Sequence, residues 1–481
     1  MLRRTGLTLL IAAALATPGA AQQVLTLQQA ITMAQEQGHE ARSVRATLEA
    51  ARHRNDAFGA RLMPQLSFGG TLPRYNRAII PVVQPDGSTL FRPLDQTDAQ
   101  LTATVSQRLP TGGDFFVSSS LATLSVSGDQ SIRTWSSTPV SFGLRHDIFR
   151  PNTLKLEKRE QPVRMELAER TFLEAREDVA LRTTTLFFDL YSARVGLANA
   201  TTNVAVNDTL FTLNKGRYEV GKIGENDLLQ SELALLRART SLDGARLELD
   251  RATAALRLAL GLAAGTPLDV TVGPEIPTYP VDTTRAVAEA LRNGANVTEA
   301  NLGELQARRR VTEARLNNGF GATVQASFGF NATASEFDLA YSNLLEARTV
   351  ALAVEIPLIQ WGARSATVQA AKAEQRQAES AAKLAHDQTA QDAHFAALQL
   401  EQARRTLALS AKADTVAAKR FEVAYNRYVI GRITIDNLYM AQNEKNEALN
   451  QYVQALRGYW MAHYRLRRLT LYDFETGQVI R

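Results

Sequence analysis

One stretch, from Gly216 to Lys222, has the glycine and lysine spacing of a known chemical motif. It reads Gly-Arg-Tyr-Glu-Val-Gly-Lys, which imitates the glycine-rich loop that cradles the phosphates of a nucleotide. Ile223 stands where that loop needs a Ser or Thr hydroxyl for Mg²⁺, and no strand pattern precedes the segment. These departures argue against a nucleotide site.

The histidines offer no metal site either. His386 and His394 are eight residues apart with no third ligand nearby. No Ser, His and Asp stand in a recognisable nucleophile context. The sequence therefore predicts no enzyme, no catalytic residue, no cofactor and no metal. The six histidines are expected to be solvated helix positions: His39, His53, His146, His386, His394 and His463.

A twelve-residue pattern that occurs twice is more informative. The chain reads RYEVGKIGENDL from Arg217 and RYVIGRITIDNL from Arg427, so an Arg, a Tyr, a Gly, an Ile and a Leu recur 210 positions later. A long helical pattern precedes each copy and a shorter one follows it, and the glycine suits a tight left-handed turn. Each copy is predicted to be the tip of a helical hairpin.

The elements that must position these tips are helices with an apolar seam. From Leu228 to Ala259, Leu alternates with Ala or Ser in steps of three and four, and a matching series runs from Leu438 to Leu469. This is a heptad seam. Large residues that alternate with small ones let helices interlock on more than one side, as antiparallel helices in a wall or tube require.

The whole chain of 481 residues begins with the features of a secretory signal. Arg3 and Arg4 precede the apolar run Leu9–Leu15 and a small-residue cleavage site that ends at Ala21. No later segment is apolar for long enough to be a transmembrane helix, so strands must make any membrane crossing. The chain has no cysteine and hence no disulfide or lipid-bearing Cys. Its net charge of +5 is too balanced to favour nucleic acid.

Two regions, at about 64–149 and about 320–359, alternate apolar and small polar residues with the period of a strand. The first holds four candidate strands and the second holds two. From Val350 to Ile356, one side of the strand is wholly apolar, which is costly in water and suits lipid. The stretch Pro81 to Asp98 is predicted to be a loop.

The order of elements is the same in two halves of the chain, so the predicted fold is mainly α, with a two-fold internal repeat of long coiled-coil helical hairpins plus antiparallel strands. The predicted layout is a signal peptide at 1–21, a first repeat at 22–261 (hairpin 154–260, tip 217–228), a linker at 262–283, a second repeat at 284–470 (hairpin 363–469, tip 427–438) and a tail at 471–481.

Three features together resemble the TolC family of outer-membrane efflux proteins, the outer membrane factors. They are the two tips, the junction from Ile356 to Gly362 between strand and helix, and the opening Thr26-Leu27-Gln28-Gln29-Ala30. The resemblance implies a homotrimer with a membrane β-barrel pooled from its subunits and an α-helical tunnel in the periplasm. It also implies two partners at the tips, a periplasmic adaptor and an inner-membrane pump of the RND or ABC class.

The resemblance also assigns two groups of site residues. Plain capping by Asn226, Thr434 or Asp436 would explain one tip, but it does not require Arg and Tyr at both. The adaptor-docking residues are Arg217, Tyr218, Gly221, Lys222, Asp227, Leu228, Arg427, Tyr428, Gly431, Arg432 and Leu438. The periplasmic gate residues are Tyr428, Arg432, Asp436 and Tyr439, where Tyr439 replaces the second acid of the family's gate.

The leading hypothesis is thus a passive exit duct in the outer membrane that serves a tripartite efflux or type I secretion system. The alternative is a structural coiled-coil protein of the cell envelope that transports nothing. Four candidate strands in the first half leave open whether the pooled barrel has the family's usual twelve strands or eighteen. The exported substrate and the class of pump are also open.

Overall fold

The computed structural model describes residues 23–127, 131–273, 276–277 and 279–481, so the expected signal peptide at 1–21 lies outside the described residues. The chain forms two compact units, and each unit combines equivalent segments of both sequence repeats. One contains the described parts of Met1–Thr47, Thr171–Gly294 and Thr389–Arg481; the other contains Leu48–Arg170 and Ala295–Gln388.

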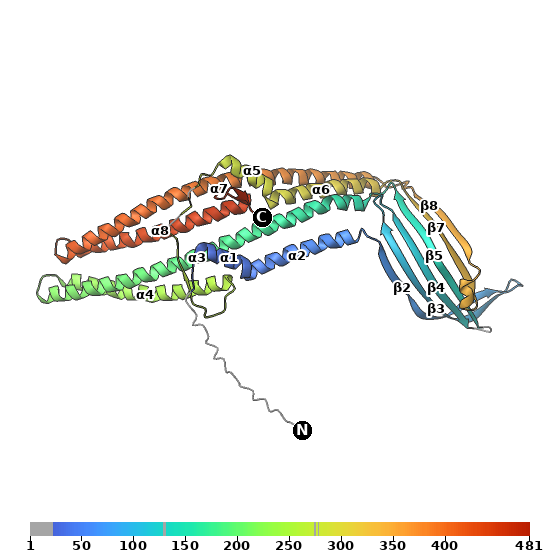
Figure 1. The fold of residues 1–481 in the computed structure, drawn as a ribbon, viewed down its shortest axis with the longest axis horizontal. Coiled ribbons are helices and arrows are strands. Elements are labelled where there is room, and N and C mark those ends of the chain that lie inside the picture. The colour runs from blue at the N-terminus through green and yellow to red at the C-terminus, as the bar shows by residue number, and fades with distance from the viewer. Residues whose placement is uncertain (1–22, 128–130, 274–275, 278) are drawn as a thin grey trace, which may run out of the picture. The chain divides into compact units, whose positions relative to one another are not determined.

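Two long helical hairpins carry the tips (Figure 1). Helix α3 (Thr153–Glu219) leads into α4 (Glu225–Ala259), and α7 (Ala363–Val429) leads into α8 (Ile435–Thr470). The two incoming helices have the same length of 67 residues, as a duplicated architecture requires. The predicted seam lies inside: α4 buries Ser231, Leu235, Ala238, Ala252 and Leu256.

A shorter pair of helices opens each repeat, where the sequence pattern from Leu25 to about Arg61 and from Thr284 to Leu316 predicts a single helical region. The first pair is α1 (Leu27–Gln37) and α2 (His39–Ala60), divided at Gly38; the second is α5 (Thr283–Asn293) and α6 (Ala295–Asn317), divided at Gly294. At both glycines a Cβ atom would lie within 2.7 Å of the carbonyl oxygen four residues earlier. Each predicted helical region is therefore two helices with a glycine between them.

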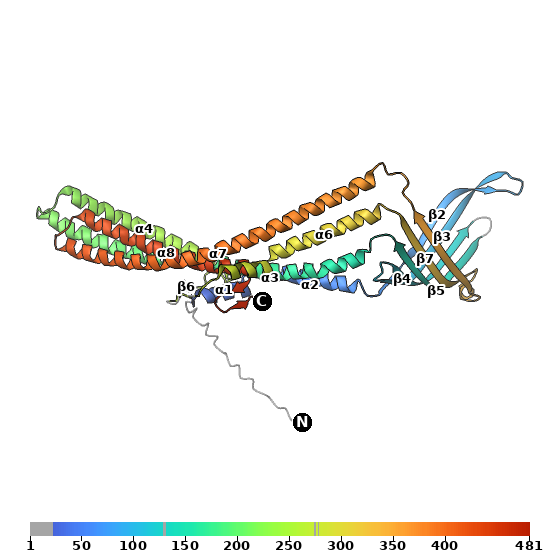
Figure 2. The same ribbon diagram turned by 90° about the horizontal axis from the view of Figure 1, so that it is seen from above.

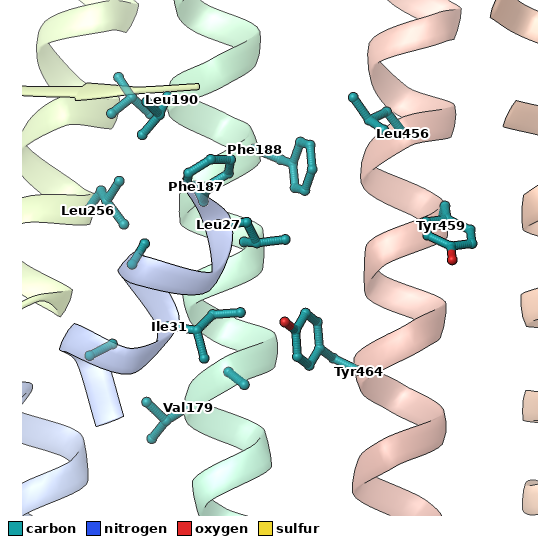
Figure 3. Packing of buried hydrophobic residues seen from close by; sticks show 14 of the residues in the cluster. Leu27, Ile31, Val179, Phe187, Phe188, Leu190, Leu256, Leu456, Tyr459 and Tyr464 are labelled. Atoms are coloured by element: carbon teal, nitrogen blue, oxygen red, sulfur yellow. The ribbon is translucent and has the colours of Figure 1, made fainter. Parts of the chain in front are cut away.

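The largest core lies in the unit that contains the tips. Leu27 and Ile31 of α1 pack with Phe188 of α3 and Tyr464 of α8, as Figure 3 shows. Beside it, β6 (Leu268–Val270) pairs in parallel with β1 (Gln23–Leu25). The linker at 262–283 thus contributes a strand that the sequence did not predict. The tail adds a two-stranded hairpin, β9 (Tyr472–Asp473) and β10 (Gln478–Val479).

The second unit contains one open sheet of six strands in which every neighbouring pair is antiparallel. The order across the sheet is β2-β3-β4-β5-β7-β8, with β2 and β8 at the two edges (Figure 1). A 3₁₀ turn, η1 (Asp338–Tyr341), joins the last two strands. The strands are β2 (Gln65–Val83), β3 (Thr89–Arg108), β4 (Asp114–Ser127), β5 (Ile132–Ile148), β7 (Gly321–Ala334) and β8 (Leu345–Glu355).

The loop predicted from Pro81 to Asp98 is wrong, because most of it belongs to β2 and β3. The two strands pair as far as Val83 with Thr89, so only a short turn remains. Cross-strand ion pairs hold the extension together: Arg74 Nε lies 3.1 Å from Asp98 Oδ1, and Arg77 pairs with Asp95. Pro81 is compatible with this position because β2 is an edge strand.

The sheet has two chemically different faces, which the printed registers define. One row across all six strands contains Leu66, Val105, Val117, Phe142, Phe328 and Arg348. The next row, whose side chains point to the opposite face, contains Ser67, Thr104, Ser118, Ser141, Gly329 and Ala347. Apart from Arg348 on the edge strand β8, the first row is apolar, whereas the opposite face is lined by small residues, most of them polar.

Four helices lie in a row in the same unit as the sheet, in the order α2, α3, α6 and α7 (Figure 2). Gln161 of α3 donates to Asn55 of α2 at 3.2 Å. Arg309 of α6 reaches Glu160 of α3 at 3.1 Å, and Arg310 of α6 pairs with Glu374 of α7 at 3.5 Å. Among the described residues, no helix is both long and apolar enough to cross a membrane.

Candidate functional site at the helical tips

Both tips fold into the same backbone turn. Gly221 and Gly431 have φ of 70° and 77°, in the left-handed region that glycine adopts without strain. The N–H of Lys222 donates to the carbonyl of Arg217 at 2.8 Å, and the N–H of Gly221 donates to that of Tyr218 at 2.9 Å. Equivalent bonds close the second tip. This is the Schellman motif, which satisfies the last carbonyls of the incoming helix.

The outgoing helices begin without the caps that plain helix chemistry predicts. Gly224 occupies the N-cap of α4, so Asn226 does not cap it. Thr434 occupies the N-cap of α8, but its hydroxyl makes no capping bond and accepts from Asn437 Nδ2 at 3.0 Å. Asp436 lies in the first turn of α8, where its charge favours the helix dipole.

The two tyrosines that recur in the motif have different surroundings. Tyr428 is 5% exposed, and its hydroxyl donates to Asn214 Oδ1 of α3 at 2.7 Å. Tyr218 is 42% exposed. Ala424 stands 210 positions after Asn214, so the second hairpin cannot offer the same acceptor. The repeat in sequence therefore gives two chemically different tips.

Arg217 joins the first hairpin to the second. Its guanidinium donates to the carbonyl oxygen of Val429 at 3.0 Å and lies 5.3 Å from the centre of the Tyr428 ring. A second link is polar: Gln230 Nε2 of α4 donates to Asp436 Oδ1 of α8 at 2.8 Å. The structure thus brings Arg217 and Tyr428 together, and it ties Asp436 to a residue that the sequence did not single out.

A small apolar core supports these contacts. Leu210 of α3 packs with Tyr428, Ile435 and Leu438, and Tyr439 lies against this cluster. Burial raises the pKa of Tyr439 to about 12. Its hydroxyl has no hydrogen-bond partner among the described residues. Tyr439 is therefore neutral at physiological pH.

The remaining tip residues are sorted by their exposure. Leu438 is buried, whereas its counterpart Leu228 is half-buried, as are Asp227 and Arg217. Tyr428 is the other buried member. The exposed side chains are Tyr218, Lys222, Arg427, Arg432 and Asp436.

Amide side chains on α3 form a feature that sequence reasoning missed. Asn199 donates to Asn446 of α8 at 3.1 Å, and Gln442 of α8 donates to Asn203 at 3.0 Å. Asn207 is buried one further step along α3. The signal was present, since these asparagines recur every four residues inside an apolar seam, which is the spacing of one helix face.

A second polar cluster, away from the tips, corrects the prediction for two histidines. His463 of α8 is 2% exposed, and its Nδ1 lies 2.5 Å from the hydroxyl of Tyr279. Burial lowers the pKa of His463 to about 4. His146 lies on β5 instead of a helix. The prediction that these two histidines occupy solvated helix positions is therefore wrong. His463 is buried and holds Tyr279 against α8, and His146 belongs to the sheet.

Among the residues that the structure describes, no group of three or more His, Cys, Asp or Glu could hold a metal ion. A polar cavity of about 510 Å³ lies where the sheet meets the helices, lined by Arg108, Asp114, Arg145, Asp147 and Arg150 among others. Its charges are largely paired, as in Arg150 with Glu355 and Arg145 with Asp147. It resembles a structural charge layer more than a ligand site.

Comparison with solved structures identifies the fold. The chain matches the Campylobacter jejuni CmeC outer membrane channel with a TM-score of 0.68 at 14% identity, over 94% of this chain and 86% of that one. It matches the Vibrio cholerae outer membrane protein VceC with a TM-score of 0.66 at 14% identity, over 93% and 96%. For the open state of the Neisseria gonorrhoeae MtrE outer membrane channel the TM-score is 0.63 at 14% identity, over 95% and 89%.

No family model matches the sequence, and neither does any curated protein. The chain nevertheless has the helical and antiparallel-sheet fold of these outer membrane channels over nearly its full length. The resemblance to the TolC family is confirmed at the level of the fold.

Proposed function

We propose that this chain is one subunit of a trimeric outer-membrane channel-tunnel that serves as the passive exit duct of a tripartite efflux or type I secretion system. The observation that carries the proposal is the chemistry of the six-stranded sheet. One face presents leucine, valine and phenylalanine, and the other presents serine, threonine, glycine and alanine. A sheet of this kind suits lipid on one side and a water-filled lumen on the other.

The exposure of the apolar face supports a lipid environment. Leu66 and Phe68 on β2 are 75% and 72% exposed, and Val350 and Leu352 on β8 are 82% and 64% exposed. Removing one such side chain from water stabilises a protein by roughly 1.5–3 kcal/mol. A continuous face of them is costly in water, and acyl chains remove that cost.

Exposed apolar stripes on the hairpins support assembly with further copies. On α7 the stripe repeats every seven residues, and on α4 it follows helical spacing, so each forms a line along one helix face. Neither stripe is buried by any other residue that the structure describes. The α7 stripe is Leu409 (73% exposed), Val416 (56%) and Val423 (47%), and the α4 stripe is Leu229 (55%), Leu233 (47%) and Leu236 (53%).

The exposed tip side chains are the proposed docking surface for a periplasmic adaptor. The side chains of Tyr218, Lys222, Arg427 and Arg432 are exposed, so a partner can reach them. An inner-membrane RND or ABC pump would then couple to the duct through the adaptor. Lys222→Cys in this cysteine-free chain should cross-link to the adaptor, and Glu248→Cys, exposed further along α4, should not.

For the gate we propose a ring of tip residues around the axis of the trimer. Three copies of Asp436 would approach one another there and attract cations. Arg432 is exposed on the same tip, and Tyr428 and Tyr439 pack in the apolar core that supports it. Because Tyr439 contributes no charge, the ring has one acid per subunit.

Fractionation tests the proposed function. The protein should be recovered with the outer membrane, resist extraction by salt and carbonate, and require detergent for release. Purified trimers should conduct ions in planar bilayers. Recovery in the soluble periplasmic fraction without detergent would contradict the duct and favour the structural coiled-coil protein of the envelope.

A further inference from the structure

The two edge strands of the sheet are open along their whole length. Every residue of β8 except Ala347 is exposed, and so is each residue of β2 from Gln65 to Arg77. Natural proteins protect open edges with proline, lysine or a covering element. β8 contains neither proline nor lysine, and no strand pairs with its outer side in the described chain.

We infer that β8 of one copy pairs with β2 of the next copy, so that three copies close an eighteen-stranded barrel. This inference rests on the proposed trimeric channel and adds how its barrel is closed. The direction of the strands supports it. Because six strands alternate in direction, β2 and β8 run opposite ways, and joining copies through them continues the antiparallel order without a break.

The chemistry of the two faces indicates that the partner of each open edge is a second copy of this chain and not an unrelated strand. On both edges the even-numbered positions face the apolar side: Leu66 and Phe68 on β2, and Val350, Leu352 and Val354 on β8. A pair that joins even with even positions keeps the apolar face continuous. A slip of one residue would turn every side chain of one copy to the wrong face.

The stagger of the strands predicts the register of this contact. We call the base of a strand its end next to the helices, which is Gln65 in β2 and Glu355 in β8. The row of paired residues that starts at Leu66, one residue from the base of β2, ends at Arg348, seven residues from the base of β8. Six residues of rise over five strand spacings correspond to a tilt of roughly 40°. Closed membrane barrels have strand tilts of about 35–45°. The sheet is therefore already inclined as a barrel wall.

If β8 and the next copy's β2 pair base to base, as β3 pairs with β4 (Arg108 with Asp114) and β7 with β8 (Gly321 with Glu355), then Leu66 of the next copy stands beside Val354 and Ser67 beside Ala353. The same register brings the η1 turn to the projecting part of β2. Tyr341, which is 45% exposed, then lies at the level of Ile79, which is 71% exposed. Two apolar surfaces that are open in one copy thus cover each other between copies.

The width of the sheet gives an independent reason for eighteen strands. Six strands about 4.8 Å apart and tilted by roughly 40° span roughly 38 Å of circumference. The row of four helices in the same unit spans about 32–40 Å at interaxial distances of 8–10 Å. Four strands would span only about 25 Å. Two strands per copy beyond the family's usual four, the extra hairpin, therefore match the width of the sheet to that of the helical row. Three such sheets close a barrel with a backbone diameter of roughly 36 Å.

Paired cysteines test the contact, because the natural chain has none. In intact outer membranes, the variant with Ser67→Cys and Ala353→Cys should form disulfide-linked dimers and trimers on oxidation, which a reductant reverses. The matched control carries Ser67→Cys and Leu352→Cys. Its thiols point to opposite faces, and it should stay unlinked.

A membrane-bound trimer in which the Ser67 and Ala353 cysteines never link would overturn the inference and leave the proposed duct intact. A soluble monomer would overturn both. A second measurement needs no substitution: an electron-microscopy reconstruction of the wild-type trimer should show eighteen strands, and twelve would show that the extra hairpin stays outside the barrel.

Discussion

Acidification should loosen the attachment of the C-terminal half of α8, because His463 is buried there as a neutral ring. Its Nδ1 lies 2.5 Å from the Tyr279 hydroxyl, and its ring makes edge-on contacts with the rings of Trp460 and Tyr464. Arg467 and Asp473 are the nearby charges. Protonation would place a cation among aromatic rings and beside a guanidinium.

The size of the effect follows from the pKa of His463, which falls from an ordinary 6.5 to about 4. The unfolded or opened state therefore binds a proton more readily than the folded state. The stability that His463 contributes is fully present above pH ~6.5 and is lost as the pH falls toward 4. Between pH 7.5 and 5.5 the free energy of local opening should drop by about 1.3 kcal/mol, a factor of roughly ten.

Hydrogen exchange can measure this opening. After correction for the intrinsic pH dependence of exchange, amides of α5 and of α8 around His463 should exchange roughly tenfold faster at pH 5.5 than at 7.5. The variant His463→Asn keeps an acceptor for Tyr279 and removes the titration, so it should show no such acceleration. The same acceleration in the variant, or none in the wild type, would refute the assignment of the effect to His463.

Three further predictions concern the tips. Gly431→Val should strain a residue with φ of 77° by about 1–2 kcal/mol and abolish export while trimers still form, whereas Gly224→Val, with φ of −82° and open space, should export normally. Asp436→Ala should reduce cation selectivity in planar bilayers, and Gln230→Leu, which removes the 2.8 Å bond but keeps the charge, should not. Tyr428→Phe leaves the buried Asn214 Oδ1 without its hydrogen-bond donor and should destabilise the tip by about 1–3 kcal/mol. A less stable tip should open more often, which a higher leak conductance of purified trimers would show.

The helical hairpins could be predicted because their signal is local and repeated. Heptad spacing identifies each helix, and the glycine of each tip marks where it turns. The apolar alternation also revealed all six strands. The breaks at Gly38 and Gly294 were missed because both residues have ordinary negative φ, and only the close approach of a carbonyl excludes a side chain.

The tertiary contacts of the tips could not be read from spacing. Nothing local links Tyr428 to Asn214 or Asp436 to Gln230, since each pair is more than 200 residues apart. The loop expected after Pro81 failed for a related reason. Proline and glycine usually mark turns, but at a sheet edge the missing N–H costs nothing, and pairing with β3 continues past it.

The tip turn is closed by backbone hydrogen bonds and one glycine, which leaves most side chains of the duplicated motif free to vary. Side chains on the turn can change without loss of the hydrogen bonds that close it. The two copies have already diverged in this way: Lys222 corresponds to Arg432, and Glu219 to Val429. On the proposed docking, a few substitutions in one copy could change what that tip recognises, while the other tip and the helices behind both stay as they were.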